Sequence, residues 1–67
     1  MTFNELDCVE LLEALPADGE DMALAAGARG TVLMVFAGGE AYLVEFCNGE
    51  GHTLAMPTLK SHQLRAG

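Results

Sequence analysis

The stretch GARGTVLMVFAGGEAYLVEFCNGEGHTLAM, residues 27–56, decides the fold of this chain. It contains three runs rich in β-branched and aromatic residues, and two turn signals separate them. Gly38-Gly39 and Asn48-Gly49 are residue pairs that accept the positive backbone angles of tight turns. The pattern predicts an antiparallel meander. Its expected strands are Thr31–Phe36, Ala41–Phe46 and Thr53–Met56.

The first turn also predicts which side chains share a face of the sheet. With Gly38 and Gly39 at the centre of the turn, Leu33 lies opposite Val44, because pairing proceeds in register away from the turn. The same register places Val35 opposite Tyr42. The predicted core face consists of Leu33, Val35, Tyr42, Val44 and Phe46.

The opposite face of the meander is apolar as well, whereas a solvated sheet face normally carries polar residues. Either the terminal segments of the chain cover this second face, or a partner covers it. If a partner does, we expect a second copy of the chain, since symmetric homodimers are the commonest assemblies. The candidate partner-binding residues are Met34, Phe36, Leu43, Leu54 and Met56.

Length and composition limit the number of domains and the ways in which the fold can be stabilised. The 67 residues make one domain, 1–67, near the size at which a hydrophobic core barely outweighs chain entropy without disulfides, metal or oligomerisation. The chain is 51% hydrophobic, a high share for a domain with so much surface to cover. Composition therefore also favours an apolar contact with a partner.

The charge is strongly negative: 3 Lys+Arg stand against 10 Asp+Glu, which gives −7 at pH 7. Seven of the acids precede the first basic residue, Arg29. Such a field repels phosphate backbones and anionic membranes, so we expect no nucleic-acid or membrane partner. Asp18, Glu20 and Asp21 do not have EF-hand spacing and are interpreted as a solvated acidic turn. A solubilising face explains the charge, and a docking site for a basic protein is the alternative.

The N-terminus offers no targeting signal. Residues 1–5 lack the basic start and apolar run of a signal peptide, and no stretch of the sequence is long enough to span a bilayer. We therefore expect a cytoplasmic protein.

Residues 4–15 are compatible with two structures. Asn4 could cap a helix with apolar residues on one face, and local propensity favours that helix. Residues 7–12 can also form a strand that covers an open edge of the meander. Pro16 ends the element in either case. Further along, 22–26 is predicted as a helical turn, and 58–62 as a 3₁₀ turn before a last strand at 63–65.

The chain resembles a small bacterial family, the domain of unknown function 4926. The most specific pieces are Gly30-Thr31-Val32, Glu40-Ala41-Tyr42 and Val44-Glu45-Phe46, and the resemblance extends over nearly the whole chain. It implies an SH3-like fold with no established activity, and it favours a strand over a helix at residues 7–12. The expected fold class is all-β: a small SH3-like β-barrel of about five antiparallel strands with a short 3₁₀ turn before the last strand.

Few residues point to chemistry. Cys8 and Cys47 have no CxxC spacing and are interpreted as small buried hydrophobes, with a cross-strand disulfide as the alternative. Cys47, His52 and His62 could supply three metal ligands, but their spacing matches no zinc pattern. Gly30 is expected at a sharp bend or a close backbone approach. We therefore expect no catalytic residue, no cofactor, no metal site and no enzyme activity.

Three functions remain open. The preferred one is a binding module that acts through protein–protein contacts and self-associates through its second apolar face. The second is an antitoxin or immunity-type protein whose acidic first third neutralises a basic partner. The third is a subunit of a metal-dependent enzyme that uses Cys47, His52 and His62.

Overall fold

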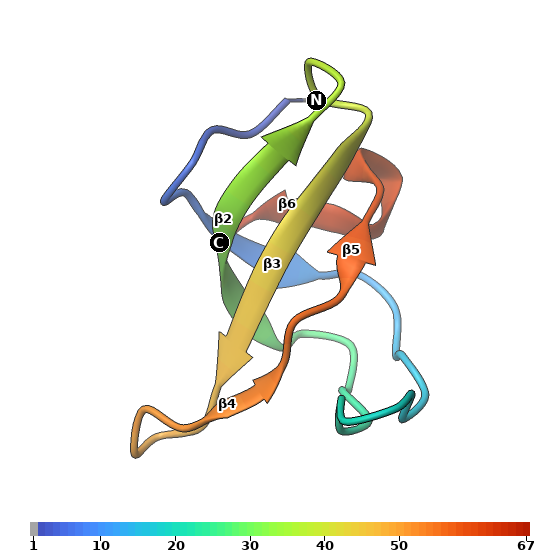
Figure 1. Ribbon diagram of the computed structural model, residues 1–67, viewed down its shortest axis with the longest axis vertical. Helices are drawn as coiled ribbons and strands as arrows, with labels where there is room; N and C mark the ends of the chain where they lie inside the picture. Colours follow the sequence, from blue (N-terminus) through green and yellow to red (C-terminus); the bar gives the residue numbers. More distant parts are fainter. Residues whose placement is uncertain (1) are drawn as a thin grey trace.

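The computed structural model describes residues 2–67, and its strands form a single antiparallel sheet (Figure 1). A 3₁₀ turn, η1 (Ser61–Gln63), precedes the last strand. The strands within the described part are β1 (Cys8–Leu11), β2 (Arg29–Phe36), β3 (Ala41–Cys47), β4 (Thr53–Ala55), β5 (Thr58–Leu59) and β6 (Leu64–Ala66). The all-β class and the 3₁₀ turn before the last strand are confirmed.

The sheet is not closed into the predicted barrel, and it has six strands where about five were expected. The strand order is β4-β3-β2-β1-β6, and β5 pairs with β3 on the same side as β4. The long loop between β1 and β2 lies near β4 and the segment after it (Figure 1). The N–H of Met22 donates to the carbonyl oxygen of Leu54 at 3.0 Å, and the N–H of Met56 donates to Asp21 Oδ1 at 3.1 Å. These two bonds join the loop to β4 and to the residue that follows it.

Residues 4–15 contain a strand, as the family resemblance implied, and not the helix that local propensity favours. Val9 and Leu11 are buried, while Cys8 and Glu10 alternate with them on the outer face. β1 pairs with β2 on one side and with β6 on the other. Hydrogen bonding to two neighbours and burial of one face together outweigh the weak local preference for helix.

The β2–β3 hairpin has the register that the sequence predicts near its turn. Val35 pairs with Tyr42, but pairing stops at Phe36 and Ala41, so the connection is longer than the predicted two-residue turn. The N–H groups of Gly39 and Glu40 both donate to the carbonyl oxygen of Phe36. The two glycines do supply positive φ angles, as expected, and Ala37 shares this conformation.

A bulge in β2 changes the predicted core. Val32 pairs with Val44 and Met34 with Leu43, so Leu33 is an extra residue and the predicted Leu33–Val44 pair is wrong. An inserted residue reverses the side-chain alternation on one side of a bulge. Val32 is therefore fully buried in place of Leu33. The backbone before the bulge is held from the other side, because the N–H of Val32 donates to the carbonyl oxygen of Asp7 at 3.0 Å.

The core lies on the inner face of the sheet and is completed by one residue from the N-terminal segment, Phe3, and one from the long loop, Leu24. Tyr42, Val44 and Phe46 are buried as predicted, and Val35 packs against the cluster. The buried set is Phe3, Val9, Leu11, Leu24, Val32, Tyr42, Val44, Phe46, Ala55, Leu59 and Leu64.

Gly30 occupies a close approach between strands, as predicted. A Cβ atom at this position would lie 2.8 Å from the carbonyl oxygen of Glu45 and 2.8 Å from Val44 Cγ1. The absent side chain is what allows β2 to pass this close to β3.

Two shorter predictions need correction. Residues 22–26 do not form a helical turn, because Leu24 is buried and exchanges two backbone hydrogen bonds with Leu15. Residues 58–59 form β5 and not the start of the 3₁₀ turn, because Leu59 is buried opposite Tyr42. The last strand accordingly begins one residue later than expected, at Leu64.

Candidate functional site

A groove of about 420 Å³ separates the long loop from the segment that joins β4 to β5. Its floor is made of the buried residues Leu24, Ala55 and Leu59. Its walls are largely apolar and come from two distant parts of the chain. Leu15, Pro16 and Met22 form the loop wall, and Met56 and Pro57 form the wall opposite.

The loop wall is a small hairpin held by its own backbone. Asp18 and Asp21 exchange two hydrogen bonds, of 3.0 and 2.9 Å, around a turn in which Gly19 has a φ of 60°. Leu15 and Leu24 exchange a second pair of hydrogen bonds further down the hairpin. Because Met22 is also bonded to β4, the loop forms a fixed wall of the groove.

Four polar side chains line the groove, those of Asp18, Asp21, Thr58 and Gln63. Asp21 accepts the N–H of Met56 and thereby joins the two walls. The Oε1 atom of Gln63 accepts the N–H of Lys60 at 2.8 Å. The carboxylate of Asp18 makes no hydrogen bond or ion pair with any residue in the range 2–67. The groove therefore presents apolar walls with an unpaired negative charge in its lining.

A second candidate surface lies on the outer face of the β2–β3 hairpin. We call Met34, Phe36 and Leu43 the outer patch. Met34 pairs with Leu43, and Phe36 pairs with Ala41. Met34 and Phe36 remain 48% and 37% exposed, so the terminal segments within residues 2–67 leave these two residues uncovered.

Of the five predicted partner-binding residues, the structure thus brings together Met34, Phe36 and Leu43. Leu54 instead packs against the core, and Met56 lines the groove. The difference arises from an irregularity in the pairing of β3 with β4, between Phe46 and Cys47, which changes the register of the strand that carries Leu54.

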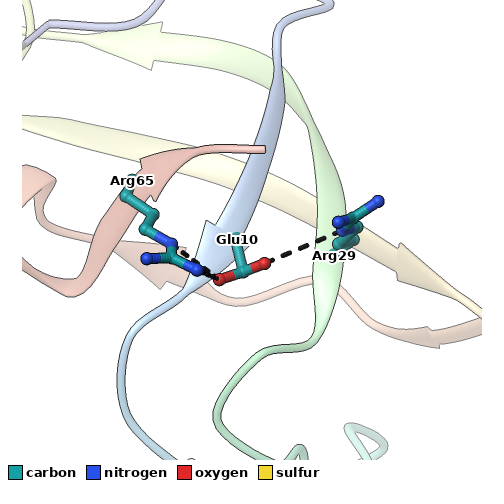
Figure 2. Close-up of polar contacts among 3 residues, drawn as sticks. All are labelled: Glu10, Arg29 and Arg65. Carbon is teal, nitrogen blue, oxygen red and sulfur yellow. Dashed lines mark hydrogen bonds and ion pairs between the residues drawn. The ribbon is translucent and has the colours of Figure 1, made fainter.

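Two of the three basic residues meet at one carboxylate, that of Glu10 (Figure 2). Arg65 Nε donates to Glu10 Oε1 at 2.6 Å, and Arg29 Nε lies 3.7 Å from Oε2. Glu10 is the only carboxylate in an ion pair among residues 2–67. This cluster carries +1, so the rest of the chain, with nine carboxylates against Lys60, carries −8. The acidic residues of the long loop thus make no ion pair within residues 2–67.

The two cysteines are free and exposed, so the prediction that they are buried is wrong. Cys8 and Cys47 occupy outward positions of β1 and β3, because the residues alternating with them, such as Val9 and Phe46, fill the core. Both thiols line a shallow hollow of about 140 Å³ together with Glu45.

The structure does not bring Cys47, His52 and His62 together as a set of metal ligands. His52 lies in the exposed turn after β3, and His62 is exposed in η1. Neither histidine lines the hollow that holds Cys47. In the described part of the chain, no group of three or more His, Cys, Asp or Glu side chains is placed to hold a metal ion.

Residues 5–66 match the family described as a domain of unknown function (DUF4926). The chain belongs to the DUF4926 family. The match confirms the resemblance read from the sequence. No curated protein and no solved structure matches this DUF4926 domain. No helix within residues 2–67 is long and apolar enough to cross a membrane.

Sequence reasoning missed the groove, because its walls lie about forty positions apart in the chain. One signal was present. Pro16 and Met22 flank the acidic turn with apolar residues, although a solvated loop would carry polar ones. No sequence pattern indicates that this loop packs beside Met56.

Proposed function

We propose that this DUF4926 domain is a small acidic binding module that acts through protein–protein contacts and self-associates through the outer patch. One observation supports this most directly: Met34 and Phe36 remain substantially exposed on a sheet face that their own chain leaves uncovered. Exposed apolar surface of this kind is typical of an interaction site.

The immediate surroundings of the outer patch favour a second copy as the partner. The strand neighbours of its residues are Ala41 and Thr58, which are uncharged. In a two-fold interface the same surface meets itself, so the three apolar side chains of each outer patch can meet those of the other. The nearest carboxylate along β3 is that of Glu45, two residues from Leu43 on the same face, and it accepts a hydrogen bond from Thr53 Oγ1. The remaining carboxylates of two copies repel at longer range, and salt screens this repulsion. Self-association should therefore strengthen as salt is added.

The substitution Leu43→Asp tests this proposal, with the molecular mass in solution measured by analytical ultracentrifugation. We expect the wild-type protein at twice the monomer mass and the variant at the monomer mass. Because Leu43 is half-buried, Phe36→Ser provides a second variant at a more exposed position. Circular dichroism checks that both variants keep the β fold.

Leu6→Asp is the matched control. Leu6 is 77% exposed, lies outside the outer patch and has a φ of 71°, a left-handed conformation that Asp tolerates better than Leu. It should leave the mass of the assembly unchanged. A wild-type protein that stays monomeric at high concentration, or folded patch variants that keep the wild-type mass, would show that the outer patch is not a self-association surface.

A second candidate function is neutralisation of a basic partner, as an antitoxin or immunity-type protein performs it. The observation that favours it is the charge of −8 left outside the Glu10 cluster. A pull-down from the native host, eluted first in low and then in high salt, separates the two functions by the sign of their salt dependence. One basic protein released by salt supports neutralisation. Recovery of the domain's own copies alone counts against it.

A further inference from the structure

We propose that the groove between the long loop and the β4–β5 segment binds an extended segment of a basic protein. Apolar side chains of that segment enter between the methionine and proline walls, and a Lys or Arg lies against Asp18. This inference rests on the second function above, neutralisation of a basic partner, and is independent of self-association through the outer patch.

The walls of the groove suit a segment of chain. Met22 and Met56 both line the groove, with exposed fractions of 58% and 41%, and the lining residues Leu24, Ala55 and Leu59 are already buried. Methionine side chains adapt to irregular apolar partners at small cost. A volume of about 420 Å³ lies in the range of pockets that receive a few side chains. An extended segment fills such a groove, whereas a flat protein surface does not.

The negative charge of the groove and its surroundings favours a basic segment over an acidic one. The carboxylate of Asp18 has no partner within residues 2–67, and Glu20 adds a second negative charge at the tip of the same hairpin. Both arginines are held on Glu10 and do not line the groove. A Lys or Arg that arrives at Asp18 gains a complementary charge, and the wider field of the domain steers it there. An acidic segment meets repulsion at the same place.

The groove is formed before a ligand arrives. The Met22–Leu54 and Asp21–Met56 hydrogen bonds hold its two walls at a fixed separation. Binding therefore requires little ordering of this chain, which favours affinity. Pro16 and Pro57 have no N–H to donate, so recognition depends on side chains more than on addition of a strand.

Selection from a displayed library of random dodecapeptides, panned against the intact protein at low salt, tests the proposal. We expect enriched peptides to combine Lys or Arg with apolar neighbours. Their dissociation constants are then measured by fluorescence polarisation for variants of each wall. Met56→Ser should weaken binding about fivefold, because it removes apolar contact and leaves the backbone N–H that Asp21 accepts. Asp18→Asn should weaken it about threefold at low salt and less in high salt, while the backbone bonds to Asp21 remain.

Two controls match these variants. Glu50→Gln removes the same charge from an exposed turn that does not line the groove, and Phe36→Ser alters the outer patch. Both should change the dissociation constant less than about twofold. Nuclear magnetic resonance adds an independent map, in which the methyl signals of Met22 and Met56 should shift on binding.

The unfavourable outcomes are distinct. A library that yields no enriched peptide, or yields acidic or uncharged ones, overturns the proposal. A different outcome is that basic peptides bind Met56→Ser as well as wild type and lose affinity for Glu50→Gln. This pair of results would show that the peptides bind the general acidic surface. That result overturns the groove but leaves neutralisation of a basic partner standing. Loss of binding with Phe36→Ser overturns the groove in favour of the outer patch.

Discussion

The backbone N–H of Phe3 donates to the phenolic oxygen of Tyr42 at 3.2 Å, and the two rings meet edge to face with their centroids 5.4 Å apart. Tyr42 is fully buried near the start of β3, beside the β2–β3 turn, whereas Phe3 comes from the segment that precedes β1. This pair fastens the N-terminal segment over one end of the core. A buried hydroxyl is tolerated there because it has a hydrogen-bonding partner.

Tyr42→Phe should reduce the free energy of unfolding by about 1–2 kcal/mol, because it leaves the N–H of Phe3 without its acceptor while the ring packing remains. Urea denaturation followed by circular dichroism measures the change. Phe3→Leu is the complementary variant, since it keeps the N–H and removes the ring contact. A Tyr42→Phe protein as stable as wild type would show that the hydrogen bond contributes nothing.

The bulge in β2 predicts unequal losses of stability when two neighbouring residues are truncated to alanine. Val32→Ala should destabilise the fold by about 2–3 kcal/mol, because it opens a cavity in the core opposite Val44. Leu33→Ala should cost about 1 kcal/mol or less, although it deletes more atoms, because Leu33 is only half-buried. Chemical denaturation of the two variants side by side tests the order. A larger loss at Leu33 would contradict the bulged register.

Gly30→Ala should destabilise the protein by about 1–3 kcal/mol, because the new methyl group would lie within 2.8 Å of the Glu45 carbonyl oxygen and of Val44 Cγ1. Thermal melting followed at one far-ultraviolet wavelength measures the loss. Gly49→Ala is the control, since a Cβ atom there has nothing within 4 Å. Equal melting temperatures for the two variants would remove the close approach as the reason for glycine at this position.

Asp21→Ala should loosen the loop wall of the groove without unfolding the sheet. The substitution removes the acceptor of the Met56 N–H, so this amide should exchange with deuterium several times faster than in the wild type. The amides of Tyr42 and Val44 in β3 should keep their protection. Asp18→Ala serves as the control, because its side chain makes no bond across the groove. An unchanged exchange rate at Met56 would show that other contacts hold the loop.

The sequence was sufficient to predict the parts of the fold that depend on pairing between strands adjacent in the chain. The Gly38-Gly39 pair marked the turn between β2 and β3, where both glycines have positive φ angles, and Asn48-Gly49 marked the turn between β3 and β4, where the positive φ angle lies at Gly51. Alternation of apolar residues identified Tyr42, Val44 and Phe46 as core. The family resemblance was needed to place a strand at residues 7–12. The local preference of these residues for helix is weak, and the strand depends on pairing with distant segments.

The tertiary structure decided what depends on contacts between distant segments. The bulge at Leu33 exists because Val32 is bonded to the segment before β1 while the rest of β2 follows the hairpin, and neither constraint is visible in the run Val32–Phe36 itself. The groove likewise exists because Asp21 bonds to Met56 and Met22 bonds to Leu54 in β4. The outer patch was predicted in part, since period-two alternation is a local property. The groove was not, because packing between separate segments depends on the whole chain and leaves no periodic pattern in the sequence.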